Sequence, residues 1–188
     1  MIRAIIFDCF GVLYGGSLEA LVSMAPVGMA QQVRDINSAK DYGYITSRDY
    51  LMQIGEVIGV TSDKVADIMR RGHTPNGPLI AVTQKLKSQY KIGLLSNIGD
   101  SLFETLFDGK AEQLFDAVVL SYREGIAKPN PEVFRLMAER LNLSPGECVM
   151  IDDLADNCEG AEVAGMRTIV HTDNASTMEQ LKQLGITV

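Results

Sequence analysis

Two apolar segments of the sequence end in carboxylates. Residues 4–7 are followed by Asp8, and residues 148–151 are followed by Asp152 and Asp153. A carboxylate at the end of a buried strand faces the crevice in which open α/β sheets bind ligands, although it can also cap the following turn. Adjacent carboxylates repel each other unless a cation lies between them. The pair therefore indicates a hard divalent metal bound through oxygen, with Asp8 available as a nucleophile.

Three further polar residues follow other apolar segments. Ser96 and Asn97 come directly after residues 91–95, and Lys128 follows residues 117–120 after a short loop. Taken singly, Ser96 is typical of a turn and Lys128 of a solvated surface charge. Together with the carboxylates, they complete a set suited to phosphoryl transfer through an aspartyl-phosphate, in which the protein positions groups and neutralises charge.

Apolar segments and amphipathic helices alternate through the second half of the chain. Strands are predicted at residues 91–95, 117–120, 148–151 and 168–170, and helices near residues 79–89, 101–108, 131–141 and 155–164. A last helix is predicted to open with a capping box formed by Ser176 and Glu179. With the strand at residues 4–7, this alternation predicts a doubly wound α/β fold: a parallel, Rossmann-like sheet with helices on both faces. The polar strand ends then lie at one edge of the sheet.

Residues 17–72 show a different pattern. They have helical spacing throughout and no strand-like alternation. Residues 72–78 contain two glycines and two prolines, which indicates a hinge. We therefore expect a Rossmann-like core formed by residues 1–16 and 77–188, with a small all-helical cap domain and its hinge at residues 17–76.

Composition argues against several classes of protein. The 188 residues are 46% hydrophobic, which is enough for a sizeable core, but no stretch approaches the apolar length of a membrane span. The formal charge of −7 argues against nucleic acid or an anionic membrane as a partner. The start of the chain lacks a signal-peptide pattern, and the three cysteines fit reduced, buried positions better than a disulfide framework. We expect a cytoplasmic protein of unspecified oligomeric state.

The polar motifs, in their order along the chain, resemble those of the haloacid dehalogenase-like (HAD) superfamily. Phe-Asp8-Cys-Phe-Gly-Val is similar to its first motif, Leu-Leu-Ser96-Asn97 to the second, Lys128-Pro-Asn-Pro to the third and Ile-Asp152-Asp153-x-x-x-Asn157 to the fourth. A helical cap between the first two motifs is also a family feature.

The resemblance implies a role for each matched residue. Asp8 would be the nucleophile, Ser96, in a motif with Asn97, would hold the transferring phosphoryl oxygens, and Lys128 would neutralise charge on nucleophile and substrate. It also implies a Mg²⁺ cofactor beside the nucleophile, whose ligands would be Asp8, the backbone carbonyl of Phe10, and Asp153 together with Asp152.

Phe10 departs from the phosphatase pattern. Family phosphatases usually carry an aspartate here, which protonates the leaving group and later activates water; such acid–base help is typically worth about 10²–10⁴-fold. An aromatic residue is instead seen in the haloacid dehalogenases proper, whose nucleophile attacks carbon without a metal. The Asp152-Asp153 pair favours a metal, because without a cation it would repel a halocarboxylate.

The resulting hypothesis is a Mg²⁺-dependent phosphatase of a small phosphorylated metabolite, slow or restricted to good leaving groups. A 2-haloacid dehalogenase that uses Asp8 on carbon is one alternative. A non-catalytic protein that keeps the pocket to bind a phosphorylated ligand is another.

Five residues near these motifs carry weaker expectations. Cys9 is expected to be a small buried side chain turned away from the nucleophile. Asn157 is expected to orient the carboxylates of the metal site. His73, in the hinge, could swing toward the pocket but is expected to be solvated. Arg34 and Arg48 are candidates for contact with an anionic substrate.

Overall fold

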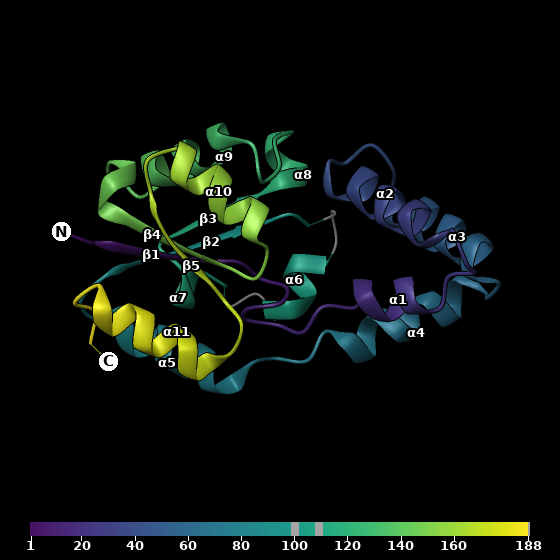
Figure 1. Cartoon of the computed structure of the whole chain (residues 1–188), viewed down its shortest axis with the longest axis horizontal. Helices are drawn as coiled ribbons and strands as arrows, with labels where there is room; N and C mark the ends of the chain where they lie inside the picture. Colours follow the sequence, from purple (N-terminus) through teal and green to yellow (C-terminus); the bar gives the residue numbers. More distant parts are fainter. Residues whose placement is uncertain (99–101, 108–110, 188) are drawn as a thin grey trace.

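A single parallel sheet forms the centre of the molecule (Figure 1). The computed structural model describes residues 1–98, 102–107 and 111–187. Within these residues the strands are β1 (Ala4–Phe7), β2 (Lys91–Ser96), β3 (Ala117–Leu120), β4 (Cys148–Asp152) and β5 (Arg167–Val170). They pair in the order β3-β2-β1-β4-β5, and every pairing is parallel. The predicted α/β fold with a parallel sheet is therefore confirmed, with β1 in the middle.

Alternate side chains of each strand enter two hydrophobic layers, one on each face of the sheet. From β1, Ile5 and Phe7 pack into one layer, while Ala4 and Ile6 pack into the other. All four side chains are fully buried, because β1 has a strand on each side and helices on both faces. Burial on both faces explains why the sequence stays apolar until Asp8.

Helices cover both faces of the sheet (Figure 1). One face carries α5 (Gly77–Leu86), α7 (Ala111–Leu114) and α11 (Asn174–Gln183), and the other carries α9 (Pro131–Arg140) and α10 (Ala155–Val163). The short helices α6 (Leu102–Phe107) and α8 (Ser121–Glu124) follow β2 and β3, and a 3₁₀ turn (Pro145–Glu147) precedes β4. Of the helix predicted near residues 101–108, residues 101 and 108 lie outside the described residues. No described helix has the length and apolar character needed to cross a membrane.

The chain between β1 and β2 forms a helical bundle beside the sheet, at the end away from both chain termini (Figure 1). Its helices are α1 (Leu18–Ser23), α2 (Ala30–Asp41), α3 (Ser47–Ile58) and α4 (Ser62–Gly72). They share a hydrophobic cluster separate from the two layers of the sheet, which includes Leu21, Val33, Tyr50, Ile54 and Val65. We call these four helices the helical insertion.

Two short segments join the helical insertion to the sheet, and they run side by side. The Gly15 N–H donates to the Thr74 carbonyl at 2.8 Å, and the Asn76 N–H donates to the Leu13 carbonyl at 2.8 Å. A Cβ at Gly15 would lie 2.4 Å from the Gly72 carbonyl oxygen, so this close approach needs glycine. The predicted boundaries of a cap domain fall within these segments, and the division into domains stays a prediction.

The connection from α4 to α5 is shorter than the predicted hinge at residues 72–78. Helix α4 continues to Gly72, and α5 already begins at Gly77 with Pro78 in its first turn. Proline is compatible with this position because the first N–H groups of a helix have no partner within the helix. The proline and glycine that indicated a loop therefore belong to a helix start.

The last helix also begins earlier than predicted. Helix α11 starts at Asn174, and the Asp173 carboxylate accepts a hydrogen bond from the Ser176 N–H at 2.9 Å. The predicted capping box of Ser176 and Glu179 is wrong, because Asp173 is a good N-cap that occurs earlier and places Ser176 inside the first turn.

Candidate active site

Three charged side chains converge at the carboxyl edge of the sheet. Asp8 follows β1, Asp152 ends β4, and Lys128 lies in the loop between α8 and α9. Lys128 Nζ lies 2.9 Å from Asp8 Oδ1 and 2.5 Å from Asp152 Oδ2, and all three residues are buried. A buried charge is costly unless it is paired, and here one lysine pairs with two carboxylates. The separate strand ends of the sequence thus form one ion-paired cluster.

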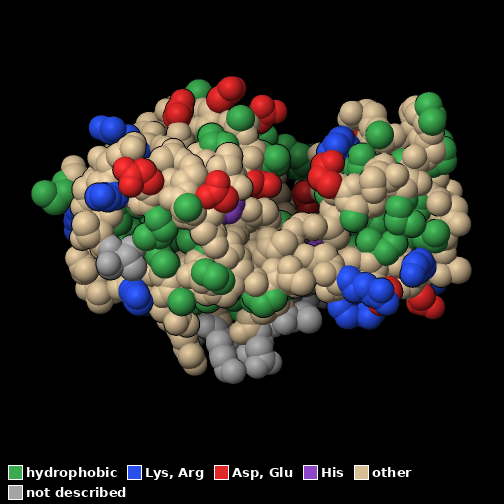
Figure 2. Space-filling view, turned by 60° about the horizontal axis from the view of Figure 1, so that its bottom comes forward, with side chains coloured by type: hydrophobic (Ala, Val, Ile, Leu, Met, Phe, Trp, Pro, Cys, Tyr) green, Lys and Arg blue, Asp and Glu red, His purple; other side chains and the backbone are tan. Residues whose placement is uncertain are grey.

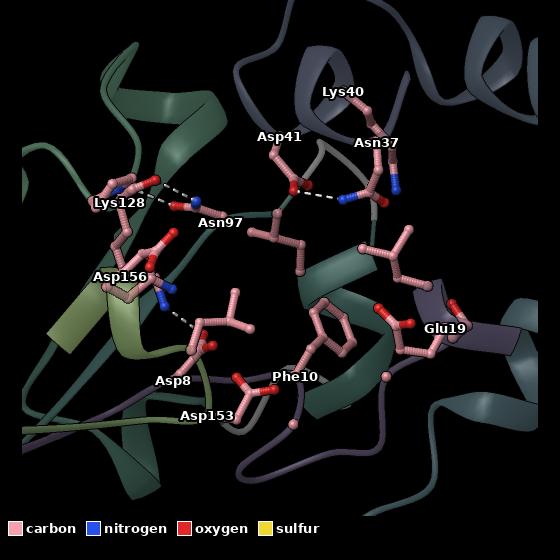
Figure 3. A pocket seen from close by; sticks show the side chains of 18 of the residues that line it. Asp8, Phe10, Glu19, Asn37, Lys40, Asp41, Asn97, Lys128, Asp153 and Asp156 are labelled. Carbon is pink, nitrogen blue, oxygen red and sulfur yellow. Dashed lines mark hydrogen bonds and ion pairs between the residues drawn. The ribbon is translucent and has the colours of Figure 1, made fainter. Parts of the chain in front are cut away.

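The side-chain amide of Asn97 holds the backbone of Lys128 (Figure 3). Asn97 Nδ2 donates to the Lys128 carbonyl at 2.9 Å, and the Lys128 N–H donates to Asn97 Oδ1 at 2.9 Å. Helix α10 supports the same loop, since a Cβ at Gly160 would lie 2.1 Å from the Pro129 carbonyl oxygen. Asn97 therefore acts on the site by placing Lys128.

Asp152 is bonded through both of its carboxylate oxygens. Its Oδ2 contacts Lys128, and its Oδ1 accepts hydrogen bonds from the Leu154 N–H at 3.0 Å and from Asn157 Nδ2 at 2.9 Å. The contact of Asn157 agrees with its expected orienting role. Because Oδ1 already accepts two bonds, only Oδ2 of Asp152 keeps a lone pair for a metal.

Asp153 lies against the turn that follows β1, beside Asp8 (Figure 3). Gly11 in this turn has a φ of 85°, and a Cβ there would lie 2.1 Å from Asp153 Oδ2. The positive φ and the close approach both require glycine. Gly11 thereby allows the Asp153 carboxylate to approach Asp8.

The three carboxylates form a set that fits a divalent cation. Asp8, Asp152 and Asp153 each offer one oxygen, and these oxygens lie within 4.8 Å of one another. Burial raises the pKa of Asp8 to about 7, against the attraction of Lys128. Burial, and then the nearby Asp152, raise the pKa of Asp153. The three carboxylates carry more negative charge than the single positive charge of Lys128 can balance. All of the possible metal ligands are hard oxygens, which Mg²⁺ prefers.

Ser96, the last residue of β2, has a hydroxyl that lacks a partner. The residue is buried, and its Oγ has no hydrogen bond to any residue that the structure describes. An unsatisfied buried hydroxyl costs about 1–3 kcal/mol. A ligand oxygen would relieve this cost, and the role that the family resemblance implies for Ser96, binding of a phosphoryl oxygen, stays a prediction.

The Phe10 ring packs against His73 at the junction with the helical insertion. The two ring centroids are 4.7 Å apart, and His73 Nε2 lies 3.3 Å from Ser17 Oγ. Burial lowers the pKa of His73 to about 4, so the imidazole is neutral at pH 7. The hinge histidine that was expected to be solvated is instead half-buried against Phe10 and Ser17, and it lines the pocket described below. Cys9 is buried, as expected.

A pocket of about 630 Å³ lies between the strand ends and the helical insertion. Figure 2 shows a hollow between these two parts of the molecule, with acidic side chains along it. The loops at the carboxyl edge of the sheet contribute Asp8, Phe10, Lys128 and Asp153 to its lining. The insertion contributes Asn37, Lys40, Asp41 and Tyr50. In Figure 3 Asn37, Lys40 and Asp41 lie across the pocket from Asp8 and Asp153.

Sequence reasoning missed the polar wall formed by α2 and α3, although a signal was present. Val33 and Ile36 mark the apolar face of α2, and Lys40 follows them by seven and four residues on that same face. A lysine within the apolar stripe of a helix indicates a buried polar site.

The two arginines considered from sequence lie elsewhere. Arg34 forms an ion pair with Glu19 at 2.7 Å, with a second bond at 3.0 Å. Arg48 is exposed at the start of α3. Neither lines the pocket formed by the described residues.

Comparison with known proteins identifies the family. The family model for haloacid dehalogenase-like hydrolases matches residues 2–165, so the chain belongs to this family of hydrolases. A sesquiterpene phosphatase of Aspergillus oryzae is 28% identical over 193 residues, which cover 97% of this chain and 96% of the relative. A glyceraldehyde 3-phosphate phosphatase of Methanopyrus kandleri is 27% identical over 194 residues, which cover 90% of this chain and 83% of the relative.

A solved structure shares the fold. It is a HAD family enzyme of Bacteroides thetaiotaomicron in complex with magnesium and inorganic phosphate. Its TM-score is 0.74 at 24% identity, covering 94% of this chain and 98% of that chain. The HAD membership inferred from the four motifs is thus confirmed by both sequence and fold.

Proposed function

We propose that this chain is a Mg²⁺-dependent phosphatase that acts on a small phosphorylated metabolite through an aspartyl-phosphate on Asp8. The observation that carries the proposal is Lys128 held between Asp8 and Asp152, beside the carboxylate of Asp153. The phosphatase that is similar over nearly the whole chain supports the same reaction.

Asp8 is the nucleophile in this proposal. A carboxylate oxygen attacks phosphorus, the bond from phosphorus to the leaving oxygen breaks, and the leaving oxygen takes a proton from water. The Cys9 N–H donates to Asp8 Oδ1 at 2.6 Å, and Lys128 Nζ contacts the same oxygen at 2.9 Å. These two contacts fix the orientation of the attacking carboxylate. Water then hydrolyses the aspartyl-phosphate.

Lys128 and Ser96 stabilise the transferring group. Lys128 balances negative charge on the nucleophile and the phosphoryl oxygens, and the Ser96 hydroxyl donates to one of these oxygens. Mg²⁺, held by Asp8, Asp153, the Phe10 carbonyl and the free lone pair of Asp152, would neutralise further charge on the phosphoryl group. Asn97 and Asn157 keep Lys128 and Asp152 in place.

Phe10 determines which esters react readily. Its ring packs against a neutral His73 and carries no proton for the leaving oxygen. The general-acid contribution of about 10²–10⁴-fold is therefore missing, and leaving groups that depart without a proton are favoured.

We also propose that the helical insertion acts as a cap domain over this site and that this domain, with its hinge, comprises residues 17–76. The Ser121 hydroxyl donates to the Asp41 carbonyl and accepts the Ile98 N–H at 3.0 Å. This contact joins the end of α2 to the loop that follows β2. A cap in this position would exclude water from the pocket during the reaction.

The test compares two products under two conditions. Phosphate release from p-nitrophenyl phosphate and halide release from a 2-haloacid are each measured with Mg²⁺ and with EDTA. Phosphate release that requires Mg²⁺ and is abolished in Asp8→Asn supports the proposal. Metal-independent halide release would overturn it in favour of the dehalogenase, the alternative that Phe10 favours. Binding of phosphate without turnover of any ester would favour a non-catalytic phospho-ligand-binding protein.

A further inference from the structure

The pocket wall opposite Asp8 contains a chain of hydrogen bonds with one direction. The Tyr50 hydroxyl donates to Asn37 Oδ1 at 3.2 Å, and Asn37 Nδ2 donates to Asp41 Oδ2 at 2.9 Å. An ionised carboxylate can only accept, so Asn37 must present its nitrogen to Asp41 and its oxygen to Tyr50. When Asp41 is ionised, the chain therefore ends in the pocket on an acceptor.

Asp41 is poorly solvated in this position. Burial raises its pKa to about 7, against the attraction of Lys40 and Lys128. Among the residues that the structure describes, Asn37 is its side-chain hydrogen-bond donor. A carboxylate that has lost water gains from any ligand that donates a hydrogen bond to it. The ligand expected here is a donor.

Lys40 distinguishes between the donors that a substrate can offer. Its side chain is buried, with Nζ 4.6 Å from the centre of the Tyr50 ring, and its charge lowers the pKa of Asp41. A substrate ammonium at Asp41 would be attracted by this carboxylate but repelled by Lys40, and a substrate carboxylate would be repelled by Asp41 itself. A neutral hydroxyl avoids both repulsions.

We infer that the leaving group of the substrate carries a hydroxyl that donates to Asp41, as in a phosphorylated polyol or sugar. Asp41 is then a specificity-determining residue, and Asn37 and Tyr50 position it; this assignment rests on the proposed phosphatase function. Phe10 and Ile98 line the same pocket and provide apolar contact for the carbon chain.

The experiment measures kcat/KM with Mg²⁺ for propyl phosphate, glycerol 3-phosphate, phosphoethanolamine and a prenyl phosphate. The expected order places glycerol 3-phosphate first. In Asp41→Asn, the ratio of kcat/KM for glycerol 3-phosphate to that for propyl phosphate should fall by about 10–100-fold, because a charged acceptor is replaced by a donor. Tyr50→Phe should lower the same ratio by a smaller factor, since it removes only the bond that orients Asn37.

The matched control is Asp35→Asn on the same helix. Asp35 is exposed and its carboxylate accepts a bond from Gln31 at 2.8 Å. This variant should leave the ratio at the wild-type value, and thermal unfolding should show that all three variants fold.

Several outcomes would overturn the inference while leaving the phosphatase function intact. One is an equal loss of kcat/KM for glycerol 3-phosphate and for propyl phosphate in Asp41→Asn. Another is a higher kcat/KM of the wild-type protein for the prenyl phosphate or for phosphoethanolamine than for glycerol 3-phosphate. A failure of the wild type to release phosphate from any ester, p-nitrophenyl phosphate included, would overturn both.

Discussion

The two ends of the pocket are built from different interactions. At the sheet end, Lys128 joins two buried carboxylates, Asp8 and Asp152, through ion pairs of 2.9 and 2.5 Å. At the insertion end, a neutral amide of Asn37 joins Asp41 through a hydrogen bond of 2.9 Å. Removal of a group at the sheet end leaves a buried charge unpaired, whereas removal at the insertion end changes one donor or acceptor.

This difference predicts different consequences of mutation at the two ends. The sheet end is fixed by strands whose side chains fill both hydrophobic layers of the core. The insertion end belongs to helices with a hydrophobic cluster of their own, so it can change without disturbing the strands. We expect changes at the sheet end to affect every substrate, and changes at the insertion end to affect the choice among substrates.

The largest effect is expected for Lys128→Met. It leaves Asp8 and Asp152 unpaired, which should lower the free energy of unfolding by about 3–5 kcal/mol. Phosphate release should fall at least about a hundredfold for every ester, because the charge of the transition state loses its partner. Denaturant unfolding and phosphate assays measure both effects. Lys64→Met, at an exposed lysine of α4, is the control, and equal stability of the two variants would contradict the ion-paired cluster.

Gly11→Ala should weaken the metal site by about 10–100-fold, the range found when groups that support metal ligands are disturbed. The added Cβ would lie 2.1 Å from Asp153 Oδ2 and would push this carboxylate away from Asp8. The measurement is the Mg²⁺ concentration that gives half-maximal phosphate release.

Gly77→Ala is the matched control for Gly11→Ala. A Cβ at Gly77 meets no described atom within 4 Å, and the residue lies at the start of α5. An unchanged Mg²⁺ requirement in both variants would argue against Asp153 as a metal ligand.

Phe10→Asp should raise phosphate release from propyl phosphate about tenfold or more, because a carboxyl group can then protonate the leaving oxygen. The gain should be smaller for p-nitrophenyl phosphate, whose leaving group needs little protonation. Phe10→Leu removes the ring without adding an acid, keeps the backbone carbonyl, and should give no gain. No gain in Phe10→Asp would favour the non-catalytic alternative.

The last effect is that of Asp41→Asn on the pH dependence of stability. The folded state raises the pKa of Asp41 from 3.8 to about 7, so in this range the folded protein binds a proton that the unfolded chain has lost. The contribution of Asp41 to stability is therefore lost as pH rises from about 4 to 7, and it levels off above that range.

Asparagine does not titrate, so the midpoint of thermal unfolding of Asp41→Asn should rise relative to wild type between pH 5 and pH 8. The midpoint should rise by about 2–4 °C for each 1 kcal/mol of stability that the wild type loses over this pH range and the variant does not. Asp35→Asn should give a curve parallel to that of the wild type. A parallel curve for Asp41→Asn as well would contradict the raised pKa of this carboxylate.

The sheet and the position of its polar edge could be predicted from sequence. An apolar run such as residues 4–7 fits a strand covered on both faces, and parallel strands bring their carboxyl ends to one edge. Asp8, Ser96 and Asp152 were therefore expected at the same edge, and the pairing of β1 with both β2 and β4 brings them near one another. Helix ends were less predictable, because several residues near a helix start can serve as its cap, as Asp173 and Ser176 show.

The partners of these residues could not be read from the sequence. Asn97 uses its amide on the Lys128 backbone, and Asp152 uses its carboxylate on Lys128 and Asn157. Such contacts depend on rotamers and on loops that follow different strands. A motif places these residues near the site but does not determine which atom each one contacts.

The sequence by itself indicated the α/β sheet and the set of groups at the strand ends, because local hydrophobic patterns mark where each strand ends, and the four motifs at those ends indicated the family by resemblance. Only the tertiary structure decided what faces that set. The spacing of Asn37, Lys40 and Asp41 places them on one side of α2, but helical periodicity does not say which surface that side meets. The packing of the helical insertion against the carboxyl edge of the sheet turns this side toward Asp8 (Figure 3).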